Sequence, residues 1–172
     1  MAREDATVSA ALDLADEVRA FYESHSYPAP FKSLDEHRKL YQNPDRHRAR
    51  SLHLWPTEKP RADRDILVAG CGTSQAAAYA MREPDAHVTG IHISEASLGH
   101  TREPQRKYGL DLHRLAIEEA GKLGRTFDEI VCTGLLHHLP DPDAGLRSLR
   151  GVLKPDRALH VMVYGTYRRA GI

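Results

Sequence analysis

A short apolar run that ends in two closely spaced glycines is the feature that most limits how this chain can fold. The run is Asp65–Ala69, and Gly70, Cys71 and Gly72 follow it directly. Such runs are typical of a strand that is buried on both faces of a parallel sheet. Glycines at its end allow a sharp turn and let a ligand approach the backbone, because no Cβ is in the way. We therefore expect a strand, a ligand-binding turn and then a helix.

From residue 65 onward, strand-like and helix-like segments alternate along the chain. This alternation requires crossover connections and predicts a parallel sheet with helices on both faces. The predicted fold class is therefore α/β, a doubly wound and mostly parallel sheet preceded by an N-terminal helical extension. The expected strands are 65–69, 87–91, 111–115, 127–132 and 158–164, and the expected helices are 75–82, 94–108, 117–123 and 143–153.

The first sixty residues differ in character from the rest. Residues 6–22 carry apolar side chains at helical spacing, and 33–40 form a second candidate helix with Ser33 as its N-cap. We therefore divide the chain into an N-terminal helical and irregular extension, 1–60, and a ligand-binding domain, 61–172. The extension holds aromatic side chains that form either a lid over a substrate or the core of the extension itself: Tyr22, Tyr27, Phe31 and Trp55.

Charge and hydropathy exclude several classes of protein. Lys and Arg number 24 and balance 24 Asp and Glu, so the formal net charge is zero, unlike the basic surface of a nucleic-acid-binding protein. No run of about 18 apolar residues is present to span a bilayer. The first residues lack the basic and then apolar pattern of a signal peptide. We expect a cytoplasmic protein that binds neither nucleic acid nor membrane.

The cysteines and histidines do not indicate a metal site. Cys71 and Cys132 lie within or just after apolar runs, so we expect small buried thiols rather than a disulfide. The eleven histidines show no spacing typical of metal ligands, and His137–His138 is their densest cluster. We therefore predict that no metal is bound.

Four segments resemble the motifs of class I S-adenosylmethionine-dependent methyltransferases. Asp65–Ser74 resembles the first motif, and Val88–Ser94 resembles the second-strand motif. Phe127–Leu139 resembles the fourth-strand motif, and Val152–Pro155 the turn before the fifth strand. Four motifs in the right order are far more specific than one. The resemblance implies a Rossmann-like core that binds S-adenosylmethionine and transfers its methyl group to a small-molecule acceptor.

The resemblance also implies which residues hold the cofactor. The glycine loop would contact its methionine half, His92 would face the ribose hydroxyls, and Ile93 would pack on the adenine. His138 would lie near the mouth of the substrate pocket. It is the candidate catalytic base if the acceptor must lose a proton, the alternative being that it only shapes its loop. The residues implied to bind the cofactor are Ala69, Gly70, Cys71, Gly72, His92, Ile93, Ile117, Glu118, Thr133, Gly134 and Leu135.

The sequence departs from the family pattern at three places. His92 stands where an acidic residue is usual, and a neutral imidazole accepts only one hydrogen bond from the ribose where a carboxylate accepts two. Ala116 stands where many relatives carry an aspartate that contacts the adenine. Asp156 and Arg157 replace the two glycines that usually follow the proline, although aspartate tolerates a left-handed turn.

These departures leave two other functions open. One is a non-catalytic methyltransferase-like module that binds or assembles and has weakened cofactor affinity. The other is a nucleotide-dependent oxidoreductase. That second function is disfavoured, because a dinucleotide fingerprint has glycine or alanine where Gln75 stands.

The resemblance also implies sheet strands that this chain does not contain. Family members continue past the fifth strand with a helix and an antiparallel hairpin, so the chain resembles a C-terminally truncated member. Residues 159–164 would then form an uncovered sheet edge, and such an edge pairs readily with another chain. We expect it to be covered by the partner subunit of a homo-oligomer, by the N-terminal segment or by residues of a longer parent.

Overall fold

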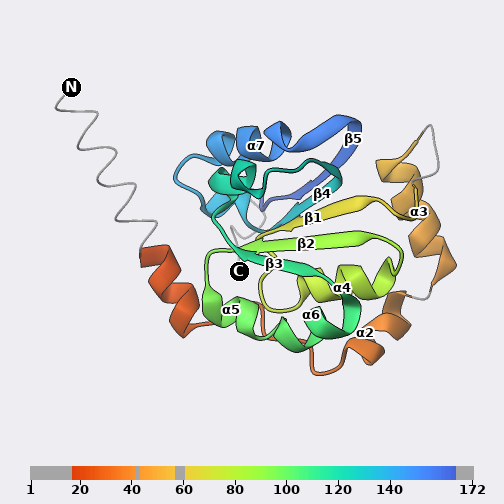
Figure 1. The fold of residues 1–172 in the computed structure, drawn as a ribbon, viewed down its shortest axis with the longest axis horizontal. Coiled ribbons are helices and arrows are strands. Elements are labelled where there is room, and N and C mark those ends of the chain that lie inside the picture. The colour runs from red at the N-terminus through yellow and green to blue at the C-terminus, as the bar shows by residue number, and fades with distance from the viewer. Residues whose placement is uncertain (1–16, 42, 57–60, 166–172) are drawn as a thin grey trace.

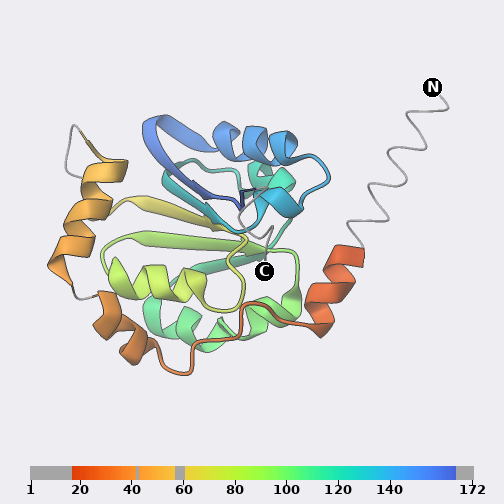
Figure 2. The same cartoon turned by 180° about the vertical axis from the view of Figure 1, so that it is seen from behind.

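The computed structural model describes residues 17–41, 43–56 and 61–165. Five parallel strands form one sheet at the centre of the molecule, and helices cover both of its faces (Figures 1 and 2). The α/β class predicted from the sequence is therefore confirmed. In chain order the strands are β1 (Asp65–Ala69), β2 (His87–His92), β3 (Asp111–Arg114), β4 (Phe127–Thr133) and β5 (Leu153–Met162).

Most of the predicted helices are present in the structure. Residues 17–24 are helical, and the remainder of the predicted N-terminal helix, 6–16, lies outside the described residues. The Ser33 hydroxyl accepts a hydrogen bond from the Glu36 amide at 3.2 Å, as expected of an N-cap. The α-helices are α2 (Leu34–Tyr41), α3 (Pro44–Leu54), α4 (Gln75–Arg82), α5 (Glu95–Gly99), α6 (Arg102–Tyr108) and α7 (Pro142–Gly151), and the 3-10 helices are η1 (Ile117–Leu123) and η2 (Leu136–His138).

The order of the strands places a functional site at one edge of the sheet. The order is β3-β2-β1-β4-β5, so the chain builds outward from β1 to β3 and then crosses back to β4 beside β1. In open parallel sheets this reversal separates the loops that leave neighbouring strands, and ligands bind in the gap beyond the carboxyl ends. The gap here lies between the loops that follow β1 and β4.

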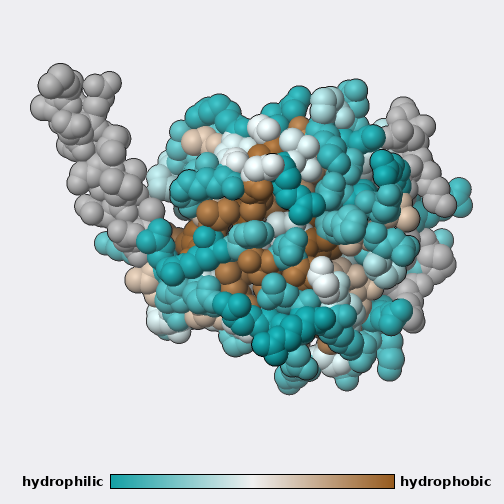
Figure 3. Space-filling model, in the orientation of Figure 1, coloured by the Kyte–Doolittle hydropathy of each residue, from teal (hydrophilic) through white to brown (hydrophobic). Residues whose placement is uncertain are grey.

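Alternate side chains of β1 enter two separate hydrophobic cores. Leu67 and Ala69 pack with residues of η1 and α7 on one face of the sheet. Ile66 and Val68 pack with residues of α4 and α5 on the other. Because successive strand residues point to opposite faces, a continuous apolar run is required where both faces are buried. On the face shown in Figure 3, apolar side chains gather in the middle of the molecule, with hydrophilic side chains around them.

The single helix predicted over 94–108 is wrong, because the structure has two helices there. Pro104 lies in the first turn of α6, and a proline ring clashes with the carbonyl four residues earlier. The chain therefore ends α5 and begins again at α6. Between the two helices, the buried Thr101 hydroxyl donates to the Thr73 carbonyl at 2.7 Å, which joins this segment to the glycine loop.

Strand β5 starts earlier than the sequence predicted. It begins at Leu153 and contains Asp156, whose φ of 54° is left-handed. The pairing register between β4 and β5 shifts at Phe127/Glu129, so the aspartate accommodates an irregularity within the strand rather than a turn before it. Its tolerance of this conformation agrees with the expectation. At the sheet edge, the end of β5 and the residues after it keep exposed apolar side chains: Val161, Met162, Val163 and Tyr164.

Burial determines the protonation state of the two cysteine thiols. Cys71 and Cys132 are both buried and free, in agreement with the sequence analysis. Burial raises the pKa of the Cys71 thiol to about 12 and that of Cys132 to about 11, so both are protonated at neutral pH.

In the described part of the chain, no helix is long and apolar enough to cross a membrane.

A buried ion-pair network joins α3 to β4, to the residue before β1 and to the end of α4. Arg64 donates to the fully buried Glu129 at 3.1 Å and pairs with Glu83 at 3.2 Å. Arg50 of α3 pairs with the same two carboxylates, at 3.0 Å in the case of Glu83. Each carboxylate is thus neutralised by two guanidinium groups. Residues 46–55 show only a basic composition in the sequence, and α3 was not predicted, since its partner carboxylates are distant in the chain.

We expect Glu129→Gln to lower the free energy of unfolding by roughly 3–5 kcal/mol, because it leaves two partly buried guanidinium groups short of a counter-charge. Urea unfolding at neutral pH measures the change. Asp63→Asn is the control, because its ion pair with Arg61 is exposed and should contribute little. Equal effects of the two substitutions would contradict a special role for the buried network.

Candidate functional site

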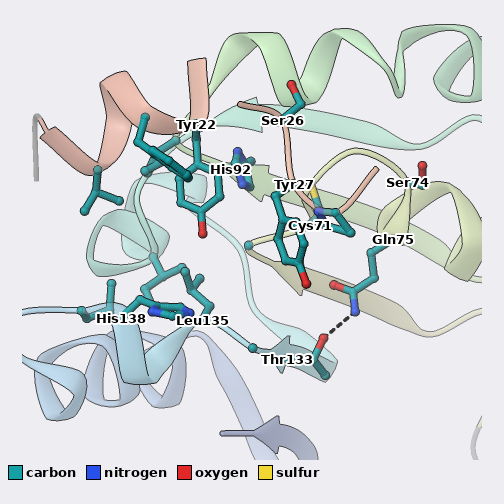
Figure 4. Close-up of a pocket in the computed structure, with 18 of the residues that line it drawn as sticks. Tyr22, Ser26, Tyr27, Cys71, Ser74, Gln75, His92, Thr133, Leu135 and His138 are labelled. Atoms are coloured by element: carbon teal, nitrogen blue, oxygen red, sulfur yellow. Dashed lines mark hydrogen bonds between the residues drawn. The ribbon is translucent and has the colours of Figure 1, made fainter. Parts of the chain in front are cut away.

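A cavity of about 680 Å³ lies at the strand-order reversal. This volume falls within the range of roughly 300–1,000 Å³ that is usual for small-molecule sites. Its floor comes from the loops that follow β1, β2 and β4, and η1 contributes one side. Its roof is the segment 17–31, which we call the lid. Figure 4 shows lid side chains facing side chains from the strand ends across this space.

The two glycines of the loop after β1 serve close approaches between protein segments. Gly70 and Gly72 have φ values of 69° and 54°, which other residues rarely adopt. A Cβ at Gly70 would overlap the side chain of Leu135, and one at Gly72 would lie 3.0 Å from the ring of Pro28. The absence of a side chain at Gly70 thus allows the loop after β4 to pack closely, and its absence at Gly72 allows the lid to do so.

Hydrogen bonds join the lid to the glycine loop. The Thr73 hydroxyl donates to the Pro28 carbonyl at 2.7 Å. The Phe31 amide donates to the Ser74 hydroxyl at 3.1 Å. Both bonds satisfy backbone groups of the lid. The lid is therefore held over the pocket by specific polar contacts as well as by its apolar side chains.

A second set of contacts fixes the lid to the loop after β2. The Glu23 carboxylate accepts hydrogen bonds from the amides of Glu95 and Ala96, at 2.8 and 3.0 Å, in the first turn of α5. These two bonds are the main reason that the pKa of Glu23 lies below its ordinary value. The Ser94 hydroxyl donates to the Tyr22 carbonyl at 3.1 Å. Glu23 therefore acts as a latch between the lid and this loop.

His92 presents a hydrogen-bond donor to the pocket, not the acceptor expected from the sequence. Its Nδ1 lies 3.1 Å from the amide of Ser94, and because an amide only donates, Nδ1 must accept. Burial lowers the pKa of the imidazole and favours the neutral ring. The proton of the neutral ring is therefore on Nε2, which is left to donate to a ligand. Tyr22 packs edge-on against this ring at a centroid distance of 5.7 Å.

The end of β4 closes the pocket on its other side. Thr133 accepts a hydrogen bond from the side-chain amide of Gln75 at 2.5 Å, which ties β4 to the start of α4 (Figure 4). Gly134, with a φ of 72°, turns the chain so that Leu135 covers Gly70. Gln75, which the sequence analysis used only as evidence against a dinucleotide site, is thus part of the pocket wall.

His138 lines the pocket from η2, and the ring of a second histidine lies beside it. The rings of His137 and His138 are 4.0 Å apart, and Tyr164 lies 4.6 Å from the ring of His137. Partial burial and the neighbouring His138 lower the pKa of His137. In Figure 4, His138 and Leu135 lie across the cavity from Tyr22. An imidazole at this position can exchange a proton with a group held in the cavity.

The structure brings most of the residues named from the sequence to this one cavity. Ala69 and Gly72 do not line it, because Ala69 lies in the hydrophobic core and Gly72 lies against Pro28. Trp55 is also absent from its walls and lies beneath Arg157 instead. The residues from the sequence analysis that do line the pocket are Gly70, Cys71, His92, Ile93, Ile117, Glu118, Thr133, Gly134, Leu135 and His138, with Tyr22, Tyr27 and Phe31 from the extension.

Several lining residues were not identified from the sequence. Val18, Phe21, His25 and Ser26 come from the lid, whose apolar spacing predicted a helix but not the surface that it covers. Met162 comes from the end of β5. Among the described residues, no group of three or more His, Cys, Asp or Glu side chains is arranged to hold a metal ion.

Residues 67–157, slightly more than half of the chain, match the family described as Methyltransferase domain. An uncharacterized protein of Synechococcus sp. is 39% identical over 112 residues, which are 62% of this chain and 27% of that protein. Ubiquinone biosynthesis O-methyltransferase of Pseudomonas aeruginosa is 33% identical over 97 residues, which are 55% of this chain and 41% of the enzyme. The matched region is thus less than half of either relative.

The fold is similar to that of solved methyltransferases. The plantazolicin methyltransferase BpumL, whose structure is a complex with SAH, aligns with a TM-score of 0.57. The alignment covers 90% of this chain and 61% of that one, at 16% sequence identity. At this identity the comparison concerns the fold alone, and it includes most of the N-terminal extension as well as the sheet.

We expect Glu23→Ala to release the lid, because the amides of Glu95 and Ala96 lose their acceptor. Trypsin cleavage at the exposed Arg19 and Lys32 should then be several-fold faster, in proportion to the larger open population. Glu17→Ala, on the same segment, is the control. Amide hydrogen exchange, which needs no active protease, gives the pH dependence: in the wild type, protection of the Glu95 and Ala96 amides should be complete above the ordinary pKa of glutamate and be lost as the pH falls through the lowered folded-state pKa of Glu23. Equal cleavage rates for the two variants would contradict the latch.

Proposed function

Because this chain belongs to the methyltransferase domain family and has the Rossmann-like fold of its class I members, we propose that its pocket binds S-adenosylmethionine for methyl transfer to a small molecule. The observation that carries the proposal is the convergence of three strand-end loops and a lid on one cavity at the strand-order reversal. Family membership alone does not establish activity, since one fold serves many functions. The site itself must therefore support the chemistry.

The residues present fit the cofactor. The loop of Gly70 and Cys71 would hold its methionine half, with Thr133, Gly134 and Leu135 closing that side. His92 would donate to a ribose hydroxyl, and Ile93 and Ile117 would pack on the adenine, with Glu118 at its edge. When bound, S-adenosylmethionine supplies a methyl group already activated by its sulfonium. The protein then has to orient the acceptor and exclude water, and the lid serves both needs.

His138 is the candidate base for an acceptor that must lose a proton. It lies on the side of the cavity opposite Tyr22, and the pocket reaches its ring. A neutral imidazole can take a proton from a hydroxyl as the oxygen becomes nucleophilic. The ring of His137 lies 4.0 Å from that of His138, at an interplanar angle of 47°. An acceptor that is nucleophilic without deprotonation would need only the cavity walls.

A non-catalytic module remains the second candidate, because His92 offers the ribose a neutral donor where a carboxylate would accept two charge-assisted bonds. Such a site binds the cofactor more weakly. The oxidoreductase prediction has no further support, since Gln75 fills the position where a dinucleotide turn needs a small residue. The boundary at residue 60, the cytoplasmic location and a partner subunit or longer parent over β5 stay predictions.

Calorimetry with S-adenosylmethionine, SAH and the nicotinamide cofactors tests the proposal. We expect the first two to bind with dissociation constants in roughly the micromolar range and the nicotinamide cofactors to show no binding. Radiolabelled methyl transfer to candidate acceptors then separates an enzyme from a binding module. Failure of both methionine-derived ligands to bind at millimolar concentration would overturn the proposal.

Substitutions at His92 test its place beside the ribose. His92→Asn should change SAH affinity little, because an amide can accept from Ser94 and still offer an N–H to the ligand. His92→Asp should tighten SAH binding by about tenfold, or roughly 1.4 kcal/mol, because a carboxylate makes charge-assisted bonds to the hydroxyls. Calorimetry measures both constants. Equal affinities for the two variants would mean that the ribose lies elsewhere.

A further inference from the structure

We propose that the methyl acceptor is a small, neutral phenol that binds between the lid and the turn after β4. This inference rests on the proposed function and adds the class of substrate to it. Four properties of the cavity support it: the side chains at its acceptor end, the charges that line it, its volume and the polar groups that face each other across it.

The walls of the acceptor end are aromatic and aliphatic. The lid contributes rings from one side, and the segments around η2 and at the end of β5 contribute two leucines, a methionine and a tyrosine from the other. A flat ring can make edge-to-face or offset contacts with the lid and dispersion contacts with the opposite wall. The residues concerned are Phe21, Tyr22, Tyr27 and Phe31 on the lid and Leu135, Leu139, Met162 and Tyr164 opposite.

The charges around the cavity disfavour an acceptor that carries a charge on the part buried in the cavity. Among the described residues that line it, Glu118 is the only one with a permanent formal charge at neutral pH. Glu118 belongs to η1, the side assigned above to the adenine. A carboxylate or phosphate on the acceptor would meet no lysine or arginine in the walls. Taking an unpaired charge out of water is costly, so a neutral ring is favoured.

The volume limits the acceptor to a small molecule. The whole cavity is about 680 Å³, roughly twice the lower end of the range for sites that hold one drug-sized ligand. Under the proposed function it must contain both the cofactor and the acceptor. The space that remains suits a single substituted ring, whose further substituents would point toward the exposed edge of the lid at Phe21 and Tyr27.

Two polar groups face each other across this apolar space and define the reacting end. The hydroxyl of Tyr22 points into the cavity toward the side that carries His138 (Figure 4). Burial raises the pKa of Tyr22, which keeps its hydroxyl protonated and able to donate. An acceptor hydroxyl between the two would receive a hydrogen bond from Tyr22 and give its own proton to His138.

The balanced step is a substitution at the methyl carbon. A lone pair of the phenol oxygen forms the new O–C bond, the methyl–sulfur bond breaks with its electron pair on sulfur, and the phenol proton passes to the His138 imidazole. The products are the methyl ether and a thioether, and the imidazolium then returns its proton to solvent. No oxidant, reductant or metal is needed.

Four probes of similar size test the acceptor class on the whole protein saturated with SAH. Phenol is the expected ligand, cyclohexanol removes the aromatic ring, and benzoate and benzylamine add a negative or a positive charge. We expect phenol to bind about tenfold more tightly than the charged probes and several-fold more tightly than cyclohexanol. Titrations followed by NMR or calorimetry measure these ratios. Equal binding of phenol and either charged probe, or of phenol and cyclohexanol, would overturn the inference.

Matched variants test the two polar groups in a methyl-transfer assay with phenol. Tyr22→Phe should raise KM several-fold, because the acceptor loses one hydrogen bond. His138→Asn should lower kcat by about a hundredfold or more with little change in KM, as expected for a lost general base. Tyr108→Phe and His113→Asn, which make the same chemical changes outside the pocket, are the controls. Variants that behave like these controls would remove Tyr22 and His138 from the reacting end.

The measurements separate three kinds of failure. SAH binding is measured first, and its absence would overturn the proposed function together with the acceptor class. Normal SAH binding without a preference for the neutral aromatic hydroxyl would overturn only the acceptor class. Normal binding of both SAH and phenol without any methyl transfer would overturn the reaction and leave a binding module.

Discussion

The reversal of strand order between β1 and β4 is the constraint on which the rest of the structure depends. Parallel strands require a crossover for every step, and here the crossovers run outward to β3 before the chain returns beside β1. The loops after β1 and β4 therefore run in opposite directions, although the two strands themselves pair directly. The cavity lies in the space that this separation leaves, and a hydrogen bond between Gln75 at the start of α4 and Thr133 at the end of β4 spans it.

Sequence patterns predicted the elements that local physics decides. The structure has the predicted bounds for strand Asp65–Ala69 and helix Gln75–Arg82. An apolar run and an alanine-rich segment each favour one secondary structure through local sequence alone. The break at Pro104 follows from a local property, the proline ring, whereas the early start of β5 depends on a register shift against β4. That shift is a tertiary property. No local pattern could have predicted it.

The cofactor side of the site could be predicted because the chain carries motifs there. Gly70, His92 and Thr133 were found because they follow strands in a recognisable order, and all three line the cavity. The aromatic side chains of the extension allowed either a lid or a core of their own, and the sequence could not decide between them, since the contacts that hold the lid are with Thr73, Ser74 and the first turn of α5, all distant in sequence. The donor character of His92 was missed, because it depends on a backbone amide that only the folded loop directs at Nδ1.

The loop after β2 joins the cofactor side of the pocket to the lid. The amide of Ser94 fixes the tautomer of His92, and its hydroxyl holds the carbonyl of Tyr22. The next two amides hold Glu23. Ser94 and the two residues after it therefore contact both His92 and the lid. The neutral donor at position 92 and the lid carboxylate at position 23 are best understood together. A carboxylate at position 92 would add a like charge near Glu23, whereas the imidazole keeps the loop neutral and leaves the latch its two amides.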